Sequence, residues 1–258
     1  MTTLGTHMPM PRRPAAQTAH QRVRPRLLGE LTLLVVGYVG YALTRVAVRG
    51  DQSTAIANGQ HIYRIERHLR LDPEQWLNSA LSAHTDLAKM AGYYYASFHF
   101  VVTAAVLVWL YWRQPASYRS QRTVLMLTTL PALAIYWWFP AAPPRFALHS
   151  LTDTLATFHI LEAAAPRSGT SLANLNAAMP SLHVAWAAWA ALALWRVFRT
   201  RYPHAALLAF CYPLATIVVV ISTANHYLLD AFAGLALLGL ATFVESMHHR
   251  TLVQLPAR

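Results

Sequence analysis

A histidine and an aspartate stand four residues apart in the segment STANHYLLD, residues 222–230, inside an otherwise apolar part of the chain. On an α-helix, positions i and i+4 share one face, which would place His226 and Asp230 one turn apart. A carboxylate in that place can hold one imidazole nitrogen protonated and leave the other free to attack, as in an oriented nucleophile or base. A buried His–Asp pair that only satisfies its own hydrogen bonds is the alternative interpretation.

A second histidine lies in the segment AAMPSLHVAW, residues 177–186. Pro180 is suited to the first turn of a helix. Ser181 and the free backbone N–H groups of that turn would form an anion-binding site. His183, just inside the helix, would then be available to protonate a leaving oxygen of a bound phosphate. A hydrogen-bonded packing histidine is the alternative.

An arginine follows two prolines in the segment APPRF, residues 142–146. Two prolines stiffen the chain just ahead of Arg145. A guanidinium on a stiff segment is a natural clamp for phosphate oxygens. An arginine that reaches from the membrane interface into water is the alternative.

The elements that must position these residues are long apolar blocks in a chain that is 55% hydrophobic and 12% charged. A membrane-spanning helix needs about 20 mostly apolar residues. We therefore predict an all-α fold, an integral membrane bundle of six transmembrane helices. A soluble helical protein is disfavoured, because too little polar sequence would remain to coat its surface. The predicted spans are 27–46, 90–112, 121–140, 179–197, 204–223 and 225–246.

The net charge of +11 would suggest a nucleic-acid partner, but the positions of the arginines indicate a membrane orientation instead. Many of them fall on one side of the six-span topology, which is the cytoplasmic side by the positive-inside rule. We therefore expect cytoplasmic N- and C-termini and no nucleic-acid partner. We also expect a bacterial plasma membrane, because the near-total use of arginine in place of lysine, with Lys89 as the only lysine, indicates a GC-rich bacterial genome. The arginines on that side are Arg12, Arg13, Arg22, Arg24, Arg26, Arg113, Arg119, Arg122, Arg196, Arg199, Arg201, Arg250 and Arg258.

The polar segments complete the predicted domain organisation. Residues 1–26 are expected to be a basic disordered tail, residues 27–248 the membrane catalytic domain, and residues 249–258 a C-terminal tail. Within the domain, 47–89 is too polar to cross a bilayer and predicts interfacial helices. The segment 141–178 is expected to be an outer active-site loop.

Two patterns within 47–89 support helices there. Ile62, Ile65 and Leu69 recur at helical spacing, with basic residues between them, which is typical of a helix in the membrane interface. The sequence LDPEQW predicts a helix start with Asp72 as the N-cap and Pro73 at the first helical position. A pair of ordinary surface helices is the alternative.

The predicted topology brings the three motifs together. The third span ends just before Arg145, the fourth begins at Ser181 and His183, and the sixth begins at His226. All of these ends fall on the outer side of the membrane. We therefore predict a two-histidine phosphoryl-transfer site at the outer face.

The order of the motifs resembles the type 2 phosphatidic acid phosphatase superfamily. The usual pattern of that family is a Lys…Arg-Pro segment, then Pro-Ser-Gly-His, then Ser-Arg…His…Asp. Here PSLH is similar to the second motif, and NHYLLD to the His-x-x-x-Asp end of the third. APPRF, AAMPSLHVAW and HYLLD are more similar to the branch that contains inositol phosphorylceramide synthases and related inositol phosphotransferases. The resemblance covers about residues 135–245.

The resemblance implies a role for each matching residue. His226 would be the nucleophile that forms a phosphohistidine, and Asp230 would orient it. His183 would protonate the leaving group and later activate the acceptor. Arg145 and Ser181 would bind the phosphate. The resemblance implies neither a metal nor another cofactor.

Two cations of the usual pattern are missing. Trp138 stands seven residues before Arg145, where the pattern has lysine, and Val220 stands six before His226, where it has arginine. Phosphoryl transfer depends on neutralising the phosphate oxygens. Arg167 in the outer loop is a candidate replacement, and Asn225 could add donors. The loss also fits a diester, whose phosphate carries less charge than that of a monoester, and so favours a transferase over a plain phosphatase.

Two classes of function follow from these patterns. The first is a membrane enzyme that moves a phosphoryl group or phospho-headgroup from a lipid phosphate or phospholipid to water, an inositol-like alcohol or a lipid alcohol. The second is a non-catalytic carrier or scaffold with the same fold. A carrier would favour broken helices and charges near the middle of the membrane. Here the ionisable residues cluster near one interface, which favours the enzyme. No oligomeric state is predicted.

Overall fold

The computed structural model describes residues 25–47, 52–160 and 177–254, and nearly all regular structure within these ranges is helical. The exception there is an isolated parallel β-bridge between Ala141 and Ala177. The helices are α1 (Leu27–Ala47), α2 (Gln52–Leu69), α3 (Glu74–Ser82), α4 (Thr85–Arg113), α5 (Pro115–Trp138), α6 (Pro144–Ala147), α7 (Thr154–Thr157), α8 (Leu182–Phe198), α9 (Pro203–Leu208), α10 (Cys211–Ser222) and α11 (Leu228–Gln254).

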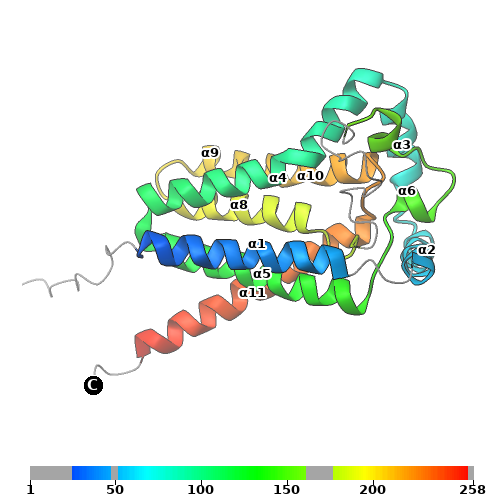
Figure 1. The fold of residues 1–258 in the computed structure, drawn as a ribbon. Coiled ribbons are helices and arrows are strands. Elements are labelled where there is room, and N and C mark those ends of the chain that lie inside the picture. Colours follow the sequence, from blue (N-terminus) through cyan, green and yellow to red (C-terminus); the bar gives the residue numbers. More distant parts are fainter. Residues whose placement is uncertain (1–24, 48–51, 161–176, 255–258) are drawn as a thin grey trace, which may run out of the picture.

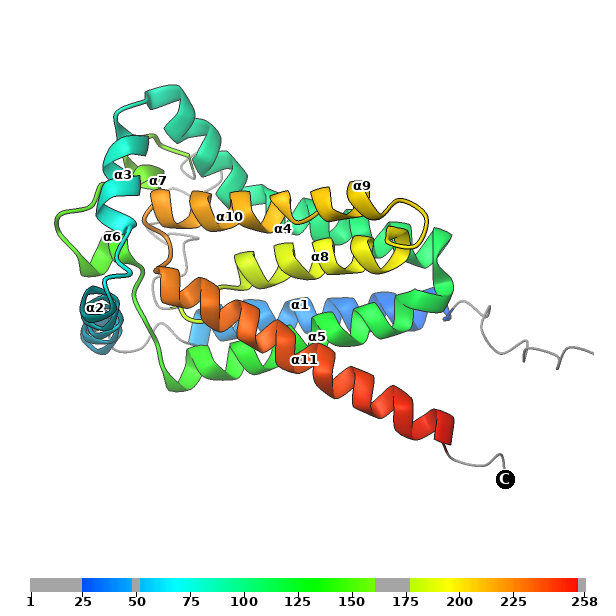
Figure 2. The same ribbon diagram turned by 180° about the vertical axis from the view of Figure 1, so that it is seen from behind.

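The long helices form a bundle with a cap of short helices at one end. Helices α1, α4, α5, α8, α10 and α11 run side by side, and the C-terminal half of α11 diverges from the others (Figures 1 and 2). Helices α2, α3, α6 and α7 gather at the end of the bundle opposite the C-terminus. In both views α2 is seen nearly end-on, so it runs across the direction of the long helices.

Three helices in the described part of the chain are long and apolar enough to cross a membrane: Thr85–Arg113, Pro203–Ser222 and Leu228–His249. Two shorter apolar helices are Leu27–Gly37 within α1 and Leu182–Phe198. Large apolar side chains such as Phe243 are exposed on these helices, as expected of surfaces that face lipid. These features confirm the prediction of an all-helical membrane protein.

Helix α8 occupies the centre of the bundle, in contact with α4, α5, α10 and α11. Its buried face is rich in alanine, including Ala185 and Ala193, and such small residues allow helices to pack closely. The fully buried Trp189 donates a hydrogen bond from Nε1 to the carbonyl oxygen of Gln121 at 2.9 Å. The site residues at the start of α8 therefore project from a tightly held helix.

The segment predicted to form interfacial helices does form α2 and α3, with two differences in detail. Helix α3 begins at Glu74 with Pro73 in the N-cap position, so the predicted N-cap, Asp72, is one residue too early. Ile62 is buried, whereas Ile65 and Leu69 are exposed. The apolar positions of α2 are thus divided between the protein interior and the outside rather than forming one lipid-facing stripe.

The predicted outer loop, 141–178, is not irregular throughout. Its described part contains two one-turn helices, α6 and α7. The predicted fifth span is divided into α9 and α10, which are separated by Ala209 and Phe210.

Candidate active site

A tight turn between α10 and α11 carries the predicted nucleophile. The backbone N–H groups of Asn225 and His226 both donate to the carbonyl oxygen of Val220, at 3.0 and 3.1 Å. Ala224 has a φ of 55°, the left-handed conformation that commonly closes a helix C-terminus. Helix α11 begins at Leu228, so His226 precedes the helix instead of lying within it as predicted. The pairing with Asp230 one turn later is nevertheless formed.

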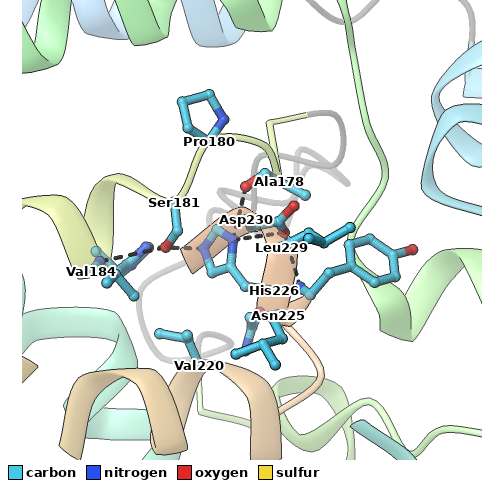
Figure 3. A network of polar contacts seen from close by, with 12 residues as sticks. Ala178, Pro180, Ser181, Val184, Val220, Asn225, His226, Leu229 and Asp230 are labelled. Atoms are coloured by element: carbon cyan, nitrogen blue, oxygen red, sulfur yellow. Dashed lines mark hydrogen bonds and ion pairs between the residues drawn. The ribbon is translucent and has the colours of Figure 1, made fainter. Parts of the chain in front are cut away.

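The hydrogen bonds of His226 define its tautomer. Nδ1 lies 2.9 Å from the carbonyl oxygen of Ala178 and 3.3 Å from Oδ2 of Asp230, as Figure 3 shows. A carbonyl oxygen can only accept, so the proton of the imidazole is assigned to Nδ1. Asp230 is fully buried and also accepts the N–H of Tyr227 at 2.9 Å. Nε2 of His226 is left as the nitrogen with a lone pair.

The second predicted histidine lies directly opposite this lone pair. Nδ1 of His183 is 3.2 Å from Nε2 of His226, although the two residues come from different helices. The ring of His183 stacks on Tyr95 with a centroid distance of 4.3 Å, and the ring of His99 lies 4.0 Å away. Both neighbours belong to α4, and their role beside His183 was missed in the sequence. The sequence alone could have singled out His99, because an ionisable side chain inside an apolar membrane span is costly and usually marks a functional site.

Ser181 connects the starts of α8 and α11. It is the N-cap of α8, with Oγ accepting the N–H of Val184 at 3.4 Å, and its own N–H donates to the carbonyl oxygen of Asp230 at 2.9 Å. A Cβ at Gly234 would lie 2.4 Å from the carbonyl oxygen of Ser181, so only glycine allows this approach. Pro180 lies before the N-cap and not within the first turn, which corrects the prediction for that residue.

Arg145 is held against the turn between α10 and α11 by a backbone hydrogen bond. Its backbone N–H donates to the carbonyl oxygen of Ala224 at 3.0 Å, two residues before His226. The guanidinium is buried, with Nε 3.6 Å from Oδ2 of Asp153 and Cζ 4.6 Å from the centroid of the Phe146 ring. Nε and Nη1 have no hydrogen-bond partner among the described residues. Buried donors of this kind are rare and suit an oxyanion.

The remaining candidates for phosphate binding differ from one another. The amide nitrogen of Asn225 donates to the carbonyl oxygen and to Oγ1 of Thr223, at 3.2 and 2.8 Å, so its donors serve the turn itself. Arg167 lies outside the described residues. Trp138 is 82% exposed and Val220 is fully buried. Both side chains are neutral, so neither supplies the cation that the usual pattern has at its position. Among the described residues, no group of three or more histidine, cysteine or acidic side chains could hold a metal ion.

An apolar helical fold that holds two histidines, an aspartate and a buried arginine around one turn defines a membrane protein with a candidate phosphate-ester site. The PAP2 superfamily matches residues 60–244, and the chain belongs to that superfamily. Neither a curated protein nor a solved structure matches the chain. Membership confirms the predicted superfamily and indicates a phosphatase-type enzyme that acts on lipid phosphate. The match begins far earlier than the predicted start near residue 135, so it includes α3 and most of α2.

Proposed function

We propose that this protein is a membrane-embedded lipid phosphatase or phosphotransferase that acts through a phosphohistidine at His226. The observation that carries the proposal is the pair of acceptors at Nδ1, the carbonyl oxygen of Ala178 and the carboxylate of Asp230. They hold the proton on Nδ1, so the lone pair of Nε2 is available to attack phosphorus. The same two acceptors stabilise the positive charge that develops on the ring during attack.

In the first step, Nε2 of His226 forms a bond to phosphorus and the bond from phosphorus to the leaving oxygen breaks. His183 acts here as an imidazolium, which the negative charge of the bound phosphate favours, and it gives its proton to the leaving alcohol. In the second step, neutral His183 takes a proton from the acceptor hydroxyl. The acceptor oxygen then bonds to phosphorus and the P–N bond to His226 breaks.

Arg145 supplies the positive charge for this reaction. Its Nε and Nη1 are buried without hydrogen-bond partners among the described residues, ready for the non-reacting oxygens of the phosphate. Ser181 adds a hydroxyl at the N-terminus of α8. Arg167 remains a further candidate for the charge that the usual lysine and arginine supply.

The membrane arrangement that we propose has six crossing helices: α1, α4, α5, α8, the α9–α10 pair and α11. Helices α2 and α3 would lie in the outer interface of a bacterial plasma membrane, with both termini in the cytoplasm. The segments that carry the proposed site, before α8 and between α10 and α11, lie at the end of the bundle where the short helices gather (Figure 1). A lipid headgroup at the bilayer surface would reach it from there.

The neutral residues Trp138 and Val220 favour a diester substrate, since a diester needs fewer cations than a monoester. The acceptor that fits best is an inositol-like or lipid alcohol, with water as the competing acceptor.

Product analysis with a panel of phospholipids, with and without free inositol, separates transfer from hydrolysis. Purified protein should also form an acid-labile, base-stable phosphoprotein with labelled lipid, and His226→Ala should abolish it. Failure to label the wild-type protein with any lipid would favour a carrier or scaffold instead.

A further inference from the structure

Three consecutive backbone amides at the start of α11 each bond a different carboxyl group. The N–H of Tyr227 donates to Asp230, which belongs to α11 itself. The N–H of Leu228 donates to Oε1 of Glu74 at 3.0 Å, and that of Leu229 to Oε1 of Glu66 at 2.6 Å. The first N–H groups of a helix have no partner within it and are usually capped by a neighbouring side chain. Here two caps come from α3 and α2, 154 and 163 residues earlier in the chain.

The two glutamates are fully buried, each with 0% exposure. Their second oxygens, Oε2 of Glu66 and Oε2 of Glu74, accept from no N–H group or hydroxyl of the described residues, and the two carboxyl groups share a hydrogen bond with each other. Burial, and next the negative charge of Glu74, raise the pKa of Glu66 to about 9, and burial raises the pKa of Glu74 as well. Glu66 is therefore a neutral acid at pH 7 that still accepts through Oε1.

Helix α2 also touches both halves of the active site. A Cβ at Gly59 would lie 2.5 Å from the carbonyl oxygen of Ala142 and 2.8 Å from the hydroxyl of Tyr227, so α2 lies directly against the two segments. Asn58 donates to the carbonyl oxygen of Pro140 at 2.8 Å, and Gln60 to that of Ala147 at 3.2 Å. Pro140 and Ala142 lie just before Arg145 in the chain, and Tyr227 directly follows His226.

We propose that Glu66 and Glu74 are positioning residues for His226, which clamp the first turn of α11 through its backbone amides. This inference rests on the proposed function, in which His226 is the nucleophile. The clamp holds the turn between His226 and Asp230, and it makes α2 and α3 part of the active site. Loss of one acceptor leaves a buried N–H unsatisfied and releases the turn.

The test compares removal of the acceptor with its replacement. We expect Glu66→Ala and Glu74→Ala to lower kcat about 10- to 100-fold, since a displacement near 1 Å at a reacting group costs about 100-fold, and to change KM less than about 3-fold. Glu66→Gln keeps an acceptor oxygen and should recover at least about tenfold over Glu66→Ala. Asp86→Ala, which removes an exposed acid on α4, is the matched control and should leave turnover unchanged.

Hydrogen exchange tests the clamp without any substrate. The amides of residues 227–230 should exchange faster in Glu66→Ala than in the wild-type protein, while those of α8 keep their protection. If Glu66→Ala does not fold, Glu66→Asp withdraws the acceptor by one methylene and should show the same local exchange and the same fall in kcat. Unchanged exchange in these amides, or kcat within about threefold of wild type in the folded variants, would overturn the proposal.

Two outcomes separate the positioning role of the glutamates from a role for the carboxyl proton and from the proposed function of the protein. If Glu66→Gln is as inactive as Glu66→Ala, the carboxyl proton rather than an acceptor oxygen is required, and the positioning role is wrong. If the wild-type protein turns over no lipid but the exchange results are as expected, the clamp stands as structure and the proposed function fails.

Discussion

Nε2 of His226 and Nδ1 of His183 lie 3.2 Å apart, although the two residues are 43 positions apart in the chain. One nitrogen carries a lone pair, because the proton of His226 is held on Nδ1 by Ala178 and Asp230. Nδ1 of His183 is therefore the donor of the hydrogen bond between the two rings. A phosphate that enters between the two rings would meet a nucleophile on one side and a proton donor beside it.

Replacing Asp230 by Asn tests the charge that Asp230 supplies to His226. Asparagine keeps the size of the side chain but removes the charge that stabilises the ring of His226 during attack. We expect kcat to fall about 10²- to 10⁴-fold, as for aspartates that orient catalytic histidines, with KM changed only a few-fold. Steady-state kinetics on a lipid substrate in detergent measure both constants. Glu245→Gln, at the other end of α11, is the control, and an active Asp230→Asn variant would remove Asp230 from the mechanism.

Replacing His183 by Ala tests the proton donor through the leaving group. Loss of a general acid lowers the rate about 10²- to 10⁴-fold for an alkyl leaving group, which needs protonation. An aryl phosphate ester leaves without a proton, so its kcat/KM, which reports the first step and not the second, should fall much less. The ratio of the two kcat/KM values, measured for the variant and for wild type, reports the role directly. Equal losses on both esters would contradict it, and His84→Ala, at an exposed position before α4, should leave the ratio unchanged.

Arg145 should matter far more for activity than for stability. Its guanidinium carries two buried nitrogens without hydrogen bonds among the described residues, a cost that an apolar side chain of similar volume relieves, but the same change removes the contact of Nε with Asp153 at 3.6 Å. Arg145→Met should therefore change the thermal midpoint in detergent only slightly while lowering kcat/KM at least about 100-fold. Arg145→Lys should not restore activity, because an ammonium lacks the planar fork of donors. A destabilised Arg145→Met protein would show that the guanidinium holds the fold rather than the phosphate.

The sequence predicts those parts of the fold and site whose signals are local. Apolar blocks of bilayer length predict the long helices, and the spacing of His226 and Asp230 predicts their pairing even though the helix begins after the histidine. The contribution of Glu66 and Glu74 could not be predicted in this way. Each belongs to a polar segment whose sequence predicts an interfacial helix. The hydrogen-bond partner of each glutamate is a backbone amide far along the chain. Backbone groups carry no sequence signature, so only the folded structure reveals the contact.

The buried position of Glu66 predicts a stability that depends on pH. Its pKa is raised from 4.5 to about 9 in the folded protein, so the folded state binds a proton that the unfolded state loses above pH 4.5. Stability therefore falls as pH rises from 4.5 towards 9. Glu66→Gln cannot ionise and lacks this loss. Its thermal midpoint relative to wild type should increase by several degrees, about 2–4 °C per kcal/mol, between pH 5 and pH 8.

The measurement needs variants that separate Glu66 from its surroundings. The titratable groups that interact with Glu66 or with its neighbour Glu74 are Glu74 itself, Asp72, Asp230, Tyr63 and Tyr227. They are all present in Glu66→Gln, so the difference between the two proteins reports the titration of Glu66 together with the change it causes in its hydrogen-bonded neighbour Glu74. Asp86→Asn, at an exposed site, should give a difference from wild type that does not vary with pH. A difference for Glu66→Gln that does not rise between pH 5 and pH 8 would mean that Glu66 is ionised in the folded protein, because a carboxyl group ionised in both states over that range leaves the stability of the wild-type protein independent of pH.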